Sequence, residues 1–350
     1  MLIFYLALFG LAFWKMKFAG KGFFAEESFS RDVTDSIKGI FIWLVFFSHF
    51  ASYVTYTSRI DTLGHAISHK LGQLIVACFL FYSGYGVCEA IKKKGSGYIK
   101  PFPKNRILKT LLNFDMAVVL FLLLALVVGH DYSLKTVLLS LVAWEGVGNS
   151  NWYIFVILAL YAITWLSFII IKNNIKLAAA LSTALIVALI VFLKLTRWQW
   201  WYDTALCYAL GMWISIFKDK LLSIVTKNNF TWLGTALGAV AVFAVSYHIR
   251  YWDALGMAAI LFNPLAFCFM IAILLMKFKV SNKLLALSGR YTFEIYILQR
   301  LPMIFFYEIG LAKFNIYLYF VLCVGVTILL AMAFRILTNK VNELLFKKKA

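Results

Sequence analysis

The sequence predicts an all-α fold, a polytopic transmembrane helix bundle of about eleven spans that forms one integral membrane domain over residues 1–350. The first observation is composition: 63% of the residues are hydrophobic and mean hydropathy is +0.86, whereas a soluble domain has roughly 45–50% apolar residues. The second is a series of apolar windows along the chain. The third is that basic residues recur between those windows, so the net charge of +19 indicates membrane topology and not nucleic-acid binding.

The apolar windows predict helices at about 2–18, 37–57, 70–91, 107–129, 152–171, 177–194, 200–217, 230–247, 254–276, 291–310 and 315–338. Polar residues interrupt two of them, at Asp203 and at Glu294 with Arg300. A further apolar segment, 134–147, is too short to span and is expected to be re-entrant or interfacial. The first window is expected to be a retained helix, because its lysines follow it instead of preceding it.

Most of the basic residues fall on one side if the N-terminus is placed outside the plasma membrane and the C-terminus in the cytoplasm. The expected inner segments include the lysine-rich stretches at 15–21, 92–109, 218–227 and 277–290 and a basic tail at 339–350. We therefore expect a multi-pass protein with this orientation, in contact with membrane lipid.

His49 is the first candidate functional residue, because it lies deep in the apolar run DSIKGIFIWLVFFSHF at residues 35–50. At ~1.5 Å per residue it lies ~16 Å from Lys38 on the same helical face, near mid-bilayer. An imidazole there is costly to bury and can move protons near neutral pH. It is either a general base or proton carrier, or a histidine that serves packing through a hydrogen bond within the bundle. Asp35 and Lys38 flank the start of this helix, where ordinary helix-end chemistry would also explain them.

A second group of candidates lies at residues 79–110. Ser83 and Gly84 interrupt a transmembrane helix, and the inner loop that follows is rich in Lys and Arg, including Lys104 and Arg106. The simple interpretation is helix packing by small residues plus positive-inside topology. The functional alternative is a site for a phosphorylated cytosolic donor, because Lys and Arg suit phosphate contacts.

A third group consists of Asn151 and Trp152 at the outer end of one helix, and Glu294 with Arg300 in a late helix. Trp at this position is typical of an interface anchor. Glu294 and Arg300 are six residues apart, so they do not face each other well and are expected to face a polar cavity or other helices. No motif predicts a metal site, a phosphate-binding loop or a nucleophile elbow.

Taken in order, these residues resemble acyltransferase family 3, a family of integral membrane acyltransferases. The family's acid, basic residue and histidine match Asp35, Lys38 and His49. Its phenylalanine-rich stretch ending in Ser-Gly matches 79–85, its tryptophan at a helix start matches 151–153, and its late Ser…Ile-Tyr-Leu pattern matches 288–298. The resemblance covers 31–338. Lys38 replaces the usual arginine, Gln299 replaces a frequent histidine, and the helix at 2–18 is additional to the usual ten.

This resemblance implies transfer of an acyl group, expected to be acetyl, from cytoplasmic acyl-CoA to a hydroxyl of a surface glycan or its lipid-linked precursor. Acyl-CoA is then a co-substrate, and no bound cofactor is expected. His49 would be the catalytic base or transient acyl carrier, with Asp35 orienting Lys38. Lys38, Ser83, Gly84, Lys104 and Arg106 would hold the donor. Asn151, Trp152, Glu294 and Arg300 are assigned to the acceptor.

A transporter or flippase of a small metabolite or lipid-linked sugar, without covalent chemistry, is the alternative. Polar residues within the spans, such as Asp115 and Asp203, would suit that function. Inverted repeats would favour it, and none is evident. Oligomeric state is left open by the sequence.

Overall fold

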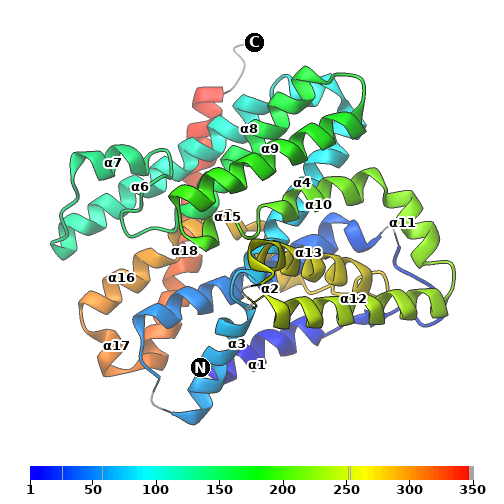
Figure 1. Ribbon diagram of the computed structural model, residues 1–350. Coiled ribbons are helices and arrows are strands. Elements are labelled where there is room, and N and C mark those ends of the chain that lie inside the picture. Colours follow the sequence, from blue (N-terminus) through cyan, green and yellow to red (C-terminus); the bar gives the residue numbers. More distant parts are fainter. Residues whose placement is uncertain (26, 57, 251, 253, 347–350) are drawn as a thin grey trace.

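The computed structural model describes residues 1–25, 27–56, 58–250, 252 and 254–346. These residues form an all-helical bundle with one short pair of strands (Figure 1). The elements, in chain order, are α1 (Leu2–Phe13), β1 (Lys17–Phe18), η1 (Glu27–Phe29), α2 (Arg31–Phe50), η2 (Ala51–Tyr53), α3 (Arg59–Leu71), α4 (Leu74–Lys94), α5 (Ser96–Ile99), η3 (Pro103–Leu108), α6 (Lys109–Val128), α7 (Leu134–Ser140), α8 (Trp152–Ile170), α9 (Ile175–Thr196), η4 (Gln199–Trp201), α10 (Leu206–Ile216), α11 (Lys218–Val225), α12 (Asn229–Ile249), α13 (Gly256–Leu274), β2 (Phe278–Lys279), α14 (Lys283–Arg290), α15 (Thr292–Leu298), α16 (Arg300–Glu308), α17 (Leu311–Phe314) and α18 (Ile316–Phe346).

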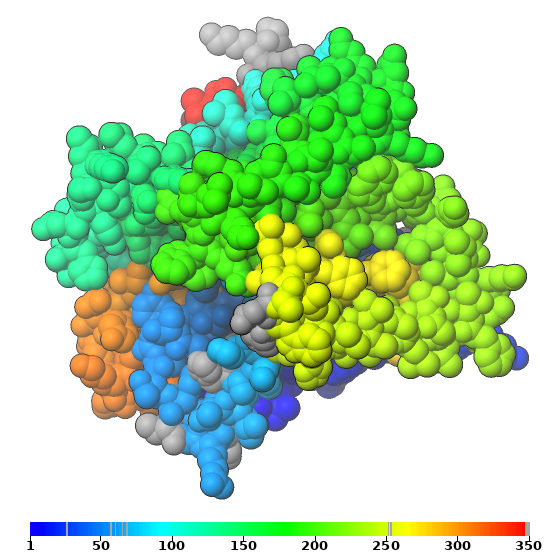
Figure 2. Space-filling view, viewed as in Figure 1, coloured from blue at the N-terminus to red at the C-terminus, as the bar shows by residue number. Residues whose placement is uncertain are grey.

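Among the described residues, eight helices are long and apolar enough to cross a membrane. They are α2 with η2, α4, η3 with α6, α8, α9, α12, α13 and α18. Buried residues are concentrated in α2 and α4, which form the centre of the bundle in Figure 1. α8 and α9 occupy one side of the surface seen in Figure 2, and α12 the other.

The three remaining expected spans are shorter or interrupted, so the count of eleven stays a prediction. α1 has 12 residues and ends before Lys15, which has a positive φ of 63°. α10 has 11 residues, because the first part of the expected span at 200–217 forms η4 and turns. The window at 291–310 divides into α15 and α16 at Gln299. Pro302 follows closely, and its missing N–H cannot complete the helical ladder across this point.

Two pairs of helices cross with their backbones in contact. A Cβ added to Gly84 of α4 would overlap the Tyr208 carbonyl of α10, and one added to Gly211 of α10 would overlap the Phe81 carbonyl of α4. The same reciprocal arrangement joins α2 and α14 through Gly39 and Gly289. Small residues permit such close approach between membrane helices. These two crossings therefore fix α4 and α2 in place.

Segments that the sequence assigns to the same side of the membrane meet in the structure. β1 pairs with β2 in antiparallel register, Lys17 opposite Lys279. The buried Lys277 ammonium donates to the carbonyls of Ala19 and Gly20 at 2.7 and 2.8 Å. All of these lie in segments expected to face inward. Which side of the membrane they face stays a prediction.

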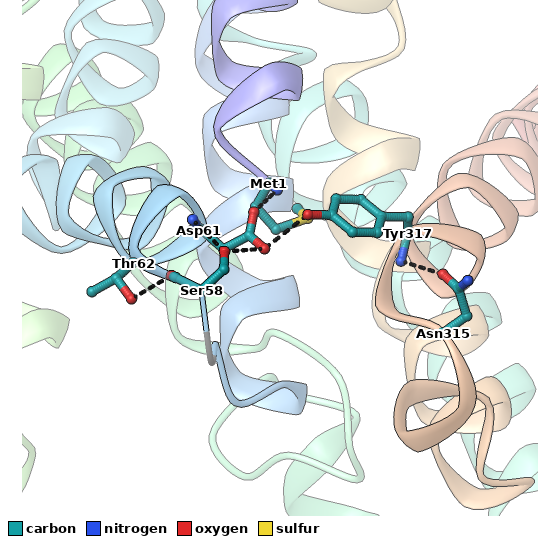
Figure 3. Close-up of polar contacts among 6 residues, drawn as sticks. All are labelled: Met1, Ser58, Asp61, Thr62, Asn315 and Tyr317. Carbon is teal, nitrogen blue, oxygen red and sulfur yellow. Dashed lines mark hydrogen bonds and ion pairs between the residues drawn. The ribbon is translucent and has the colours of Figure 1, made fainter.

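Segments that the sequence assigns to the outer side of the membrane meet at Asp61 of α3 (Figure 3). Its carboxylate pairs with the Met1 amino group and accepts hydrogen bonds from the hydroxyls of Ser58 and Tyr317, each at 2.9 Å. Burial would raise the pKa of Asp61, but these hydrogen bonds hold it below its ordinary value. A depressed carboxyl pKa stabilises the fold above the ordinary pKa, and this contribution is lost as the pH falls through the lowered value.

We expect Gly84→Ala to lower the Tm of the detergent-solubilised protein, because its Cβ must displace the backbone of α10. Overpacking of this kind typically costs about 1–3 kcal/mol. Gly325→Ala is the control, because a Cβ there meets nothing within 4 Å. An equal Tm for both variants would contradict the backbone contact between α4 and α10.

Candidate active site

A cavity of about 660 Å³ opens among α2, α4, η3, α6, α8, α14 and α15. The basic side chains that line it are exposed or half-buried and mark its exposed end, while the aromatic side chains are mostly buried and mark its buried end. The basic residues that line it are Arg31, Lys38, Arg106, Lys109 and Arg290. The aromatic residues that line it are Phe79, Tyr82, Tyr153, Tyr161, Phe293 and Tyr296. The cavity therefore combines a cationic entrance with an aromatic interior that carries several tyrosine hydroxyls.

Asp35 organises the cationic entrance from the first turns of α2. Its side chain is buried and lies 3.6 Å from Arg31 Nε and 3.4 Å from Lys38 Nζ. The i,i+4 and i,i+3 spacings place these partners on one helical face. The expected pairing of Asp35 with Lys38 is present, and Arg31 is a second partner to which the sequence analysis gave no role in the site. Asp35 thus holds two cations at the cavity.

Ser83 and Gly84 separate in the structure. Ser83 lines the cavity, and its hydroxyl lies 2.9 Å from the Tyr161 hydroxyl. Gly84 instead lies against the backbone of α10, which agrees with the packing interpretation. Residues three and four positions apart share a helical face, so Gly86 and Val87 lie on the face of Ser83. Gly86 lines the cavity, and a Cβ there meets nothing within 4 Å.

Arg106 and Lys104 also take different positions on η3. Arg106 lines the cavity and donates from Nε to the Tyr98 hydroxyl at 3.1 Å. Burial raises the pKa of Tyr98, and the Arg106 guanidinium opposes that rise. Lys104 does not line the cavity; its ammonium lies over the Phe346 ring, 5.5 Å from the centroid. Only Arg106 of this pair is therefore placed to meet a ligand.

His49 lies in the last turn of α2, behind the buried end of the cavity and not among its lining residues. Its Nδ1 is buried and has no hydrogen-bond partner among the described residues. Its ring centroid is 6.2 Å from that of Tyr296, which does line the cavity and lies 5.2 Å from Tyr153. Tyr296 thus separates the cavity from His49. The sequence placed Tyr296 in a motif without assigning it a role.

Glu294 and Arg300 do not pair with each other, as their spacing predicts. Arg335 of α18 holds Glu294 through two hydrogen bonds of 2.7 Å, from Nε and from a terminal guanidinium nitrogen. Arg300 donates from Nε to the Tyr53 hydroxyl at 2.9 Å and lies near His49. Neither residue lines the cavity. Glu294 therefore fixes α15 to α18, while Arg300 places a cation near His49.

Asn151 and Trp152 lie at the start of α8 and do not line the cavity. Asn151 donates from Nδ2 to the Ala143 carbonyl at 2.9 Å, and Trp152 packs edge-on against Tyr153. The polar atoms without partners come just earlier in the chain. Asn149 Nδ2 is buried and has no hydrogen-bond partner among the described residues. The hydroxyls of Ser150 and Tyr296 are also buried, lie close to each other, and keep hydrogen-bonding capacity that the described residues do not fill. Buried orphan polar atoms are uncommon and call for a ligand, water or another explanation.

A comparison with protein families matches residues 34–336 to the acyltransferase domain of acyltransferase family 3. The match begins just before Asp35 and ends just after Arg335, so it contains the whole cavity wall except Arg31 and Asn342. α1 lies outside it. No curated protein and no solved structure matches the chain.

Because the match covers most of the chain and every residue of the proposed catalytic centre, this multi-pass membrane protein belongs to acyltransferase family 3, a family of O-acyltransferases.

Proposed function

We propose that the protein transfers an acyl group, acetyl in the simplest case, from cytoplasmic acyl-CoA to a hydroxyl of a surface glycan or its lipid-linked precursor. The observation that carries this proposal is the polarity of the cavity. Its exposed end is lined by basic side chains, and its buried end leads through Tyr296 toward His49. An acyl-CoA donor matches this arrangement, because its phosphates would meet the basic end while its neutral arm would carry the thioester toward His49.

The donor enters with its phosphates at the basic end. Lys38 provides a point charge but not the forked geometry of the arginine that the family usually has there. Arg31 supplies that fork two helical turns before Lys38 and beside the same Asp35 carboxylate, and its side chain is 85% exposed. Arg106 approaches from η3, on another wall of the cavity. Together they provide charge-assisted hydrogen bonds to phosphate oxygens.

The reaction needs a group that takes a proton from the acceptor hydroxyl. In the proposed step a neutral His49 imidazole accepts that proton while the hydroxyl oxygen attacks the thioester carbonyl. The tetrahedral intermediate collapses, the carbon–sulfur bond breaks, and the imidazolium returns the proton to the departing thiolate. His49 as a transient acyl carrier would use the same position. Tyr296 would have to turn aside, or the acceptor would reach His49 from the Arg300 side.

The acceptor is proposed to bind at the buried polar atoms around Tyr296. Asn149, Ser150 and Tyr296 offer unused donors or acceptors, and a sugar hydroxyl both donates and accepts. Asn151, Trp152 and Glu294 would act indirectly here, because their own contacts shape the segment and the helix that carry these groups. Arg300 would contribute its charge near His49.

The proposed orientation places α5 in the cytoplasm and the segment before α7 outside. All five native cysteines are free and buried, so an engineered cysteine can be labelled selectively. In intact cells, we expect a membrane-impermeant maleimide to label His130→Cys and not Ser96→Cys, with Ser96→Cys labelled only after the membrane is opened. Labelling of Ser96→Cys in intact cells would reverse the topology.

We expect His49→Gln to reduce acylation by about 10²-fold or more, because glutamine hydrogen-bonds but does not exchange a proton near neutral pH. The measurement is mass analysis of surface glycan from cells at matched expression. His248→Gln, at an exposed position of α12, is the control. Near-normal acylation in the His49→Gln cells would assign His49 to packing and return the transport alternative to first place.

We expect Arg106→Ala to raise the KM for acyl-CoA about three- to tenfold with a smaller change in kcat. A partly exposed phosphate contact far from the reacting carbonyl supplies uniform binding of modest size. Lys100→Ala removes a nearby exposed cation that does not line the cavity and serves as the control. Equal KM values for the two variants would leave Arg106 a topological role only.

A further inference from the structure

We call the 660 Å³ cavity described above the donor cavity. A second cavity, of about 430 Å³, lies beside it near the start of α2. The two cavities share Arg31, Lys38, Tyr82 and Gly86 as lining residues. Gly86 contributes no side chain to the wall between them, and a Cβ there would meet nothing within 4 Å. The two spaces are therefore adjacent lobes that meet at two cations, a tyrosine and a glycine.

The second lobe has an aromatic wall. Phe29, just before α2, stacks on Tyr85 of α4 with ring centroids 4.7 Å apart and an interplanar angle of 19°. Both residues line this lobe and neither lines the donor cavity. Aromatic faces bind planar bases through stacking, which is largely independent of base identity.

The charge of the second lobe favours an anion. Lys218, at the start of α11, lines it together with Arg31 and Lys38. Its one lining carboxylate, Glu89, is already engaged: Lys92 Nζ and Ser215 Oγ each lie 2.7 Å from it. Lys218 also lies near Glu89, but the three cations that line the lobe, Arg31, Lys38 and Lys218, outnumber this carboxylate.

We propose that this lobe binds the nucleotide half of the acyl-CoA donor, a base and ribose that carry phosphate. The base would lie against the aromatic wall of Phe29 and Tyr85, and the ribose phosphate would meet Lys218. The diphosphate would sit at the junction beside Arg31 and Lys38, and the pantetheine arm would pass Gly86 into the donor cavity. This inference rests on the proposed function, because it assigns a place to the remainder of the same donor.

The test compares two donors on Lys218→Gln, a change at a half-buried position outside the donor cavity. Acetyl-CoA carries the nucleotide and S-acetyl-pantetheine lacks it. We expect the KM for acetyl-CoA to rise about three- to tenfold and the KM for S-acetyl-pantetheine to stay unchanged. Lys220→Gln, an exposed lysine on the same helix that lines neither cavity, should match the wild type with both donors.

A binding measurement makes the test independent of turnover. Adenosine 3′,5′-bisphosphate should raise the Tm of the wild type and of Lys220→Gln, and raise that of Lys218→Gln less. An unchanged acetyl-CoA KM in Lys218→Gln, or an equal rise for both donors, would overturn the nucleotide lobe. If the wild type uses neither donor, the proposed function fails instead, and the bisphosphate experiment alone decides whether the lobe binds a nucleotide.

Discussion

The site depends on the crossing of α2 and α14, where two helices meet backbone to backbone. Gly39 lies against the Leu285 carbonyl and Gly289 against that of Asp35, so neither helix can shift without a clash. This contact holds the Asp35 carboxylate in a buried position between Arg31 and Lys38. A buried carboxylate without partners is strongly unfavourable, so the two cations are held near it. The crossing thus decides where the positive charge of the cavity lies.

α2 also connects the two ends of the site. Its first turns carry the Asp35 cluster, and its last turn carries His49. A rigid helix therefore fixes the separation between the Asp35 cluster and His49, which in the proposed function is the distance that the neutral arm of the donor bridges. Between the two ends lie aromatic residues, with Tyr296 against His49. The basic side chains lie near the exposed end, where they stay hydrated and avoid the free-energy cost of burying a charge. The imidazole lies in the buried part of the bundle.

The crossing of α4 and α10 plays a complementary part. It directs Gly84 into the helix interface, and the helical repeat then turns Ser83 and Gly86 toward the cavity. The same helix presents Tyr82 and Gly86 to both lobes and Tyr85 to the second lobe alone. The close packing of the α4 and α10 backbones therefore sets which residues of α4 line the site. This coupling explains why small residues are spaced so closely in this part of the chain.

The sequence by itself determined the helical membrane fold. Hydropathy and segment length are local properties, and the bilayer requires long apolar segments whose backbone hydrogen bonds are satisfied within a helix. It also determined the pairing of Asp35 with Lys38, since a three-residue spacing on a helix permits it wherever the helix lies. Only the tertiary structure decided that Arg106 faces the cavity while Lys104 faces Phe346, and that Glu294 binds Arg335. These partners come from distant helices, and their rotation about their axes is set by packing. The broken helix at Gln299 and the lobe between Phe29 and Lys218 likewise depend on contacts across the bundle that no local pattern contains.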